Sequence, residues 1–162
     1  MGNWSTYFSI TESIAAGLCG LLFIALSMNI KQILSITKSK LPSRAVGSLV
    51  LLGNITIVSN LCLVPEQPIF WLGLEIFLLG LILWIPTARL DLLIYHTVED
   101  LYKKAYLRNL FFLHFSILPF LLAGIILMYG SNTGYYILVP GIIISLIKAL
   151  LDVWYLTVEI NK

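Results

Sequence analysis

The sequence predicts an all-α fold: a polytopic membrane helical bundle with five transmembrane helices, forming a single transmembrane domain over residues 1–162. Two observations lead to this prediction. Hydrophobic residues make up 59% of the chain and charged residues only 11%, whereas soluble domains carry about 25% charged residues. The apolar residues also gather in five stretches, each close to the roughly 20 residues that a helix needs to cross a bilayer.

The predicted spans cover about residues 13–30, 46–64, 69–85, 110–129 and 135–157. Each is apolar around most of its circumference, unlike the one-sided stripe of a soluble amphipathic helix. None alternates between apolar and polar residues as β-barrel strands do. The Pro65–Pro68 turn separates the second span from the third, and the Ser131–Gly134 turn separates the fourth from the fifth. Charged connections separate the other pairs.

The lysines and arginines indicate an orientation. Nine of the ten lie in alternate connections or at the end of the chain, namely Lys31, Lys38, Lys40, Arg44, Arg89, Lys103, Lys104, Arg108 and Lys162. The tenth, Lys148, lies within the fifth span. Because cytoplasmic connections are enriched in lysine and arginine, the pattern predicts an N-terminus outside the membrane and a cytoplasmic C-terminus.

The longest connection, about residues 91–107, mixes apolar and charged side chains. Such a mixture is typical of a helix that lies in the membrane interface. The same residues are also consistent with a third span that continues beyond Pro86. In that case Pro86 is expected to kink the helix or to end its regular hydrogen bonding.

Ionisable side chains at membrane depth are costly, and each is therefore a candidate functional residue. Glu75 lies about two turns into the third span, where it is an ion or proton site, a protonated or hydrogen-bonded carboxyl group that ties the span to a neighbour, or a carboxyl group close enough to the surface to reach water. Lys148 and Asp152 are four residues apart in the fifth span, so they share one helix face and can neutralise each other. They form either a structural pair or part of a charge-lined passage or partner contact.

The second span carries Asn54 near the middle of the membrane, followed by Thr56, Ser59 and Asn60. In lipid such groups form hydrogen bonds between helices. Asn54 is the member of this group that we retain as a candidate site residue. In the first span, the spacing of Ala16 and Gly20 is typical of helices that pack closely.

The remaining features favour no cofactor, metal or nucleic acid. Cys19 and Cys62 lie in apolar stretches without a Cys-x-x-Cys pair, which gives no zinc or dithiol motif. They are either two apolar core residues or a disulfide in the outer half of the membrane. Basic residues form no run with interleaved aromatic residues, so nucleic-acid binding is disfavoured. No metalloprotease, nucleophile-elbow or phosphate-loop motif occurs, which disfavours an enzyme.

Three stretches carry a resemblance: GLLFIALSMNI in the first span, LPSRA before the second and LVPEQP after it. They resemble a family of small multi-pass bacterial membrane proteins with no assigned activity. The resemblance covers less than half of the chain. It implies a bacterial inner membrane and a helical bundle, and it transfers no catalytic residue.

Two functions are compatible with these features. The intramembrane polar residues favour an oligomeric channel or small carrier, whose pore would form between protomers because five spans enclose little space. The small-residue spacing and the 91–107 connection favour instead a structural or regulatory subunit that binds a membrane protein partner. In either case the lipid bilayer is the first partner of the chain.

Overall fold

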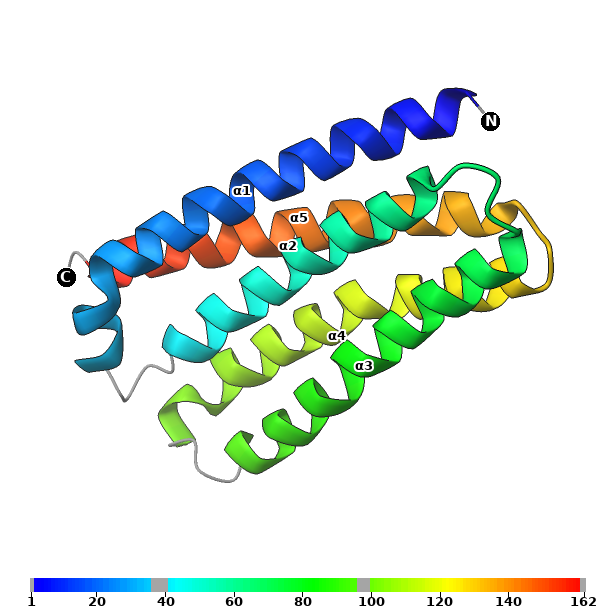
Figure 1. Cartoon of the computed structure of the whole chain (residues 1–162). Coiled ribbons are helices and arrows are strands. Elements are labelled where there is room, and N and C mark those ends of the chain that lie inside the picture. Colours follow the sequence, from blue (N-terminus) through cyan, green and yellow to red (C-terminus); the bar gives the residue numbers. More distant parts are fainter. Residues whose placement is uncertain (1, 36–40, 96–99, 161–162) are drawn as a thin grey trace. The chain divides into compact units, whose positions relative to one another are not determined.

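The computed structural model describes residues 2–35, 41–95 and 100–160, and within these residues it contains five α-helices and no strand (Figure 1). The helices are α1 (Gly2–Ser35), α2 (Leu41–Leu63), α3 (Ile69–Tyr95), α4 (Asp100–Met128) and α5 (Thr133–Ile160). All five are long and apolar enough to cross a membrane. The predicted all-α fold with five transmembrane helices is therefore confirmed, while the predicted orientation stays a prediction.

The first helix begins earlier than its predicted span. Its apolar membrane-compatible part runs from Trp4 to Met28, where we expected a start near residue 13. Residues 2–12 contain one charged side chain, Glu12, so little opposes their entry into the membrane. The Thr11 hydroxyl donates a hydrogen bond to the Tyr7 carbonyl at 2.8 Å. This bond satisfies a polar side chain within its own helix.

Pro86 does not end α3, which continues to Tyr95. Proline has no N–H group and gives the carbonyl four residues earlier no hydrogen bond. Beside this gap, the Thr87 hydroxyl donates to the Leu83 carbonyl at 2.6 Å, which satisfies a polar side chain within its own helix.

Between Pro86 and the fourth span, the structure forms no separate interface helix among the residues it describes. Residues 91–95 prolong α3 and residues 100–107 open α4, while residues 96–99 lie outside the described part of the chain. The expectation of one interfacial helix over residues 91–107 is therefore wrong for these residues. The reason is that α3 continues past Pro86 to Tyr95. This is the alternative that the sequence left open, a third span that extends beyond Pro86.

The chain divides into two compact units. Unit 1 comprises Met1–Val64 and Ser145–Lys162, and unit 2 comprises Pro65–Ile144. Helix α5 contributes its first part to unit 2 and its second part to unit 1. A single transmembrane domain over residues 1–162 stays a prediction.

In unit 1, α1 and α2 pack side by side and run in opposite directions (Figure 1). The second part of α5 completes the core of this unit. Leu22 of α1, Leu52 of α2 and Ala149 of α5 are each at most 2% exposed and contact one another. These three residues show that three helices meet in unit 1, although the segments lie far apart in the sequence.

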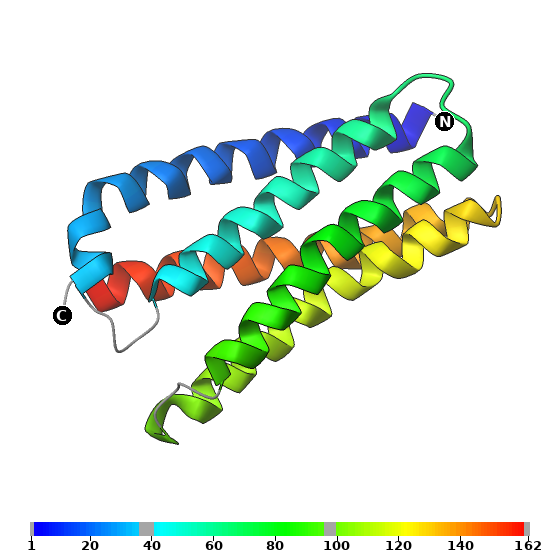
Figure 2. The ribbon, with the colours of Figure 1, turned by 60° about the horizontal axis from the view of Figure 1, so that its bottom comes forward.

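In unit 2, α3 and α4 lie side by side (Figure 2) and approach each other closely at two glycines. A Cβ atom at Gly73 of α3 would lie 2.7 Å from the Gly124 carbonyl oxygen of α4. A Cβ atom at Gly124 would lie 2.8 Å from the Phe77 backbone nitrogen. Small residues permit such contact between membrane helices, where close packing replaces the hydrophobic effect as the driving force.

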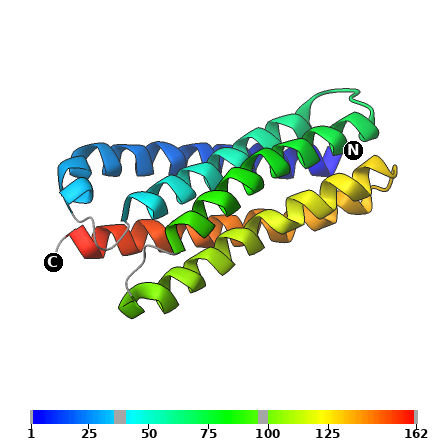
Figure 3. The ribbon, with the colours of Figure 1, turned by 90° about the horizontal axis from the view of Figure 1, so that it is seen from below.

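A tight turn joins α4 to α5 (Figure 3). The Ser131 N–H group donates to the Ile126 carbonyl at 3.3 Å, and the Gly130 N–H group donates to the Leu127 carbonyl at 2.8 Å. These two bonds are those of a Schellman motif. Its left-handed residue is Gly130, with φ of 78°, a conformation that glycine adopts without steric cost.

Candidate functional site

Lys148 and Asp152 form the centre of the candidate site, in the part of α5 that belongs to unit 1. The Lys148 ammonium group is paired with Oδ2 of Asp152, four residues further along the helix. This contact agrees with the prediction that the two side chains share one helix face. Lys148 is 5% exposed and Asp152 is 4% exposed, so both ends of the ion pair are buried.

A third side chain, Ser48, reaches the pair from α2. Its hydroxyl donates a hydrogen bond of 2.9 Å to the same Oδ2 atom of Asp152. Ser48 is itself fully buried. The Asp152 carboxylate thus accepts hydrogen bonds from Lys148 on its own helix and from Ser48 on α2. The bond from Ser48 links α2 to α5 within unit 1. We call Ser48, Lys148 and Asp152 the polar triad.

The triad lies near the ends of two membrane-compatible segments. Ser48 is close to the start of the Val46–Leu63 segment and Asp152 is close to the end of the Thr133–Trp154 segment. Lys148 lies one turn deeper, about 9 Å from the Trp154 end at the helical rise per residue. The long lysine side chain extends toward that end to reach Asp152, in the way that charged side chains at membrane depth reach toward an interface.

The ion pair between Lys148 and Asp152 lowers the cost of burying their two charges. A lone charge in hydrocarbon is expensive, and a neutral pair that is also hydrogen-bonded is far less so. Lys148 and Asp152 carry opposite charges, and the Ser48 hydroxyl adds a donor to the carboxylate. The triad is therefore neutral as a whole, but removal of any one member leaves buried polar atoms with fewer partners.

Glu75 has a different partner and belongs to unit 2. Its Oε2 atom accepts a hydrogen bond of 2.6 Å from Nε2 of Gln67. Gln67 lies in the turn before α3, and Glu75 is partly buried in that helix. The carboxyl group thus ties this turn to its own helix, and the three interpretations of Glu75 stay predictions.

Asn54 lies on α2 but not on the face that carries Ser48. It shares a stripe with Leu51 and Val58, three residues before it and four after it, and all three are at most 2% exposed. Neither its amide nitrogen nor its amide oxygen has a hydrogen-bond partner within the described residues. The structure therefore does not bring Asn54 into the polar triad. Within the described residues, no hydrogen bond offsets the free-energy cost of removing this amide from water.

Three members of these polar contacts are not among the residues that the sequence singles out: Gln67, Ser48 and Glu12. Ser48 was overlooked, although its position near the end of a span matches that of Asp152. Glu12 was overlooked as an intramembrane residue because the first span was expected to begin after it. Its Oε1 atom accepts a hydrogen bond of 2.8 Å from Asn60 Nδ2, which links α1 to α2. This contact confirms that Asn60 joins two helices.

The cysteines and the other ligand-forming side chains add no further centre. Cys19 and Cys62 are both free thiols and partly buried, so they do not form a disulfide. Over residues 2–35, 41–95 and 100–160, no group of three or more histidine, cysteine, aspartate or glutamate side chains is placed to hold a metal ion.

Comparison of the chain with protein-family models, with curated proteins and with solved structures found no match.

Proposed function

We propose that the protein is a small ion channel or carrier of a bacterial inner membrane and that the polar triad is its functional site. The single observation that carries this proposal is a buried, neutral Lys148–Asp152 pair held by Ser48 at membrane depth. The resemblance of the first two spans to small bacterial membrane proteins supports the location.

A buried ion pair by itself adds little to the stability of a fold. Replacement of a buried ion pair by packed apolar residues of similar size is often neutral or stabilising. Stability alone therefore gives little reason to keep two charges inside a membrane. Intramembrane ion pairs commonly mark ion or proton pathways, and the triad fits this use because a proton or cation at the Asp152 carboxylate would compete with Lys148.

In the proposed working cycle, a proton or small cation binds the Asp152 carboxylate. The carboxylate then holds the Lys148 ammonium group less strongly. The lysine side chain turns toward the interface at the Trp154 end of its segment, and the site opens. Five helices enclose little space for a pore, so the passage forms between protomers of an oligomer.

Flux measurements on the protein reconstituted in liposomes test this proposal. Wild-type protein should make the vesicles permeable to at least one small ion, and Lys148→Met should abolish that flux. Lys104→Met is the matched control, since Lys104 is exposed on α4, and it should leave the flux unchanged. Wild-type vesicles no more permeable than empty ones would refute the proposal.

The double variant Lys148→Met/Asp152→Leu separates function from folding. It leaves no unpaired charge, so it should fold about as well as the wild type. The proposal requires that it lose the flux nevertheless. A folded double variant with wild-type flux would show that the pair is structural only.

A second candidate function, a structural or regulatory membrane subunit, is favoured by one face of α1. Ala16, Gly17 and Gly20 are all exposed there, and a Cβ atom at Gly17 or Gly20 would meet no atom within 4 Å. In membranes, small residues at this spacing allow two helices to approach closely. The face is thus suited to a helix of a partner protein.

Purification in a mild detergent tests this second candidate. A partner should be recovered in a fixed ratio to the wild-type protein, and Gly20→Leu should remove it. Gly53→Leu serves as the control, because Gly53 lies on α2 and a Cβ atom there also meets nothing within 4 Å. Recovery of the wild-type protein without any partner would contradict this function.

A further inference from the structure

The contact between α1 and α2 in unit 1 carries a polar pair that the proposed function does not use. Glu12 of α1 accepts a hydrogen bond of 2.8 Å at Oε1 from Nδ2 of Asn60 on α2. The same nitrogen donates to the Thr56 carbonyl at 3.1 Å, so both hydrogens of the Asn60 amide are engaged. Glu12 is partly buried and Asn60 is exposed. The pair therefore lies at the surface of unit 1 and not in its core.

The polar atoms that remain in this pair are all acceptors. Oε2 of Glu12 and the side-chain carbonyl oxygen of Asn60 receive no hydrogen bond from the described residues. The hydroxyl group of Thr56, one turn before Asn60, already donates its hydrogen to the Leu52 carbonyl at 3.0 Å. A carboxyl group and an amide oxygen thus lie together without a donor for either.

No basic side chain of α1 or α2 lies near Glu12. The nearest lysine or arginine in α1 is Lys31, nineteen residues away, and the nearest in α2 is Arg44, sixteen residues from Asn60. At the helical rise per residue these separations are about 24–28 Å, well beyond the reach of a side chain. Lys148 of α5 belongs to the polar triad. Among the described residues of unit 1, the carboxyl group of Glu12 therefore has no cationic partner.

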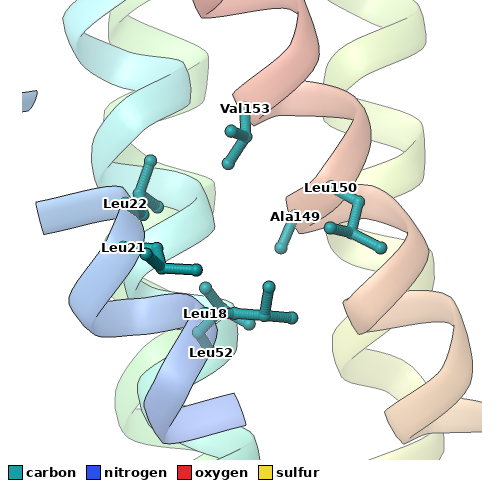
Figure 4. A pocket seen from close by; sticks show the side chains of 7 residues that line it. All are labelled: Leu18, Leu21, Leu22, Leu52, Ala149, Leu150 and Val153. Carbon is teal, nitrogen blue, oxygen red and sulfur yellow. The ribbon is translucent and has the colours of Figure 1, made fainter. Parts of the chain in front are cut away.

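The pair lies near one membrane surface. Asn60 lies three residues before the end of the Val46–Leu63 segment, about 5 Å from that end at the helical rise per residue. Further into the membrane, α1, α2 and the second part of α5 border an apolar cavity of about 120 Å³ (Figure 4). Leu18 of this cavity follows Glu12 by six residues, and all of the lining side chains are hydrocarbon. The Leu63 end is therefore the side from which water reaches the pair.

We propose that Glu12 and Asn60 bind a monovalent alkali cation. Hard cations take oxygen ligands such as carboxylates, amide carbonyl groups and water, and the pair supplies the first two without a competing donor. Water from the Leu63 end completes the coordination shell. One monovalent cation neutralises the single carboxylate, whereas a divalent cation would leave a net charge at membrane depth, which is costly. The site lies twelve residues along α2 from Ser48, so it is separate from the polar triad.

Carbodiimide labelling of the full-length protein in a mild detergent tests the proposal. A hydrophobic carbodiimide adds to a protonated carboxyl group, and peptide mass spectrometry identifies the modified residue. A bound cation keeps Glu12 ionised, so sodium or potassium chloride should slow its labelling, about tenfold when the cation concentration is about ten times Kd. Choline chloride at the same concentration should not. Because no transport is measured, the result does not depend on whether the protein conducts ions.

Two amide variants separate the site from a general effect of salt. Asn60→Leu removes the amide oxygen but keeps the carboxyl group, so Glu12 should still be labelled and most of the protection should be lost. Gln67→Leu is the matched control, because Gln67 donates to Glu75 in unit 2 by the same kind of bond, and it should leave the protection of Glu12 unchanged. The comparison of sodium with choline on the wild-type protein needs no variant, so it decides the matter even if Asn60→Leu does not fold.

Four outcomes would overturn the proposal. The first two concern the wild type: no labelling of Glu12 in choline chloride, or labelling that sodium, potassium and choline slow equally. The third is full protection of Glu12 in the Asn60→Leu variant. The fourth is stronger protection by calcium than by either alkali cation at equal concentration, which would contradict a site for a monovalent ion.

Discussion

The contact between Gly73 and Gly124 in unit 2 provides a quantitative prediction. A methyl group added at Gly73 would lie 2.6 Å from the Met128 backbone nitrogen and 2.7 Å from the Gly124 carbonyl oxygen. Both are backbone atoms, so Gly73→Ala requires that α3 and α4 move apart. Overpacking of this kind costs about 1–3 kcal/mol.

The matched control is Gly17→Ala in α1. Gly17 is exposed, and a Cβ atom there meets nothing within 4 Å. Alanine has a higher helix propensity than glycine, by about 1 kcal/mol in a helix interior. Both variants gain this amount, so it cancels when they are compared with each other. The free energy of unfolding of Gly73→Ala should therefore fall below that of Gly17→Ala by about 1–3 kcal/mol.

Unfolding by sodium dodecyl sulfate in mixed micelles, followed by circular dichroism, measures this difference. Gly17→Ala should be as stable as the wild type or more stable. Thermal unfolding should show the same order, at about 2–4 °C for each kcal/mol in a chain of this size. Equal stability of the two alanine variants would refute the close approach of α3 and α4.

Three further predictions concern polar groups and use the same unfolding measurement. Lys148→Met or Asp152→Leu alone should cost about 3–5 kcal/mol, because one buried charge loses its partner, and the double variant should cost much less; a double variant as unstable as the single ones would contradict this. Asn54→Leu should raise stability by about 1–3 kcal/mol, since neither polar atom of the amide has a partner within the described residues, and a clear loss of stability would show that the amide is bound. Asn60→Leu removes the hydrogen bond to Glu12 and should cost about 0.6 kcal/mol; a cost above that of Asp152→Leu would be inconsistent with a single bond between helices.

The errors at the sequence level have local physical causes. The first span begins earlier than predicted because Glu12, which precedes the predicted start, has an amide partner in α2 and lies within the helix. For the connection after the third span, the mixture of apolar and charged side chains fits an interface helix as well as an extension of the third span beyond Pro86. In the structure the helix continues through it to Tyr95.

The sequence by itself determined the fold class, the number of spans and the shared helix face of Lys148 and Asp152. Length and hydropathy decide whether a segment crosses a bilayer, and helical periodicity places residues four apart on one face. None of these inferences requires knowledge of a neighbouring helix.

Only the tertiary structure decided which helix faces which. The hydrogen bond between Ser48 and Asp152 joins residues 104 positions apart, and the contact between Gly73 and Gly124 joins two helices. In a soluble helix, an apolar stripe indicates the buried side. Here the helices are apolar around most of their circumference because lipid covers the outer side as protein covers the inner one. The sequence pattern therefore contains no marker of the inward face, and packing alone selects it.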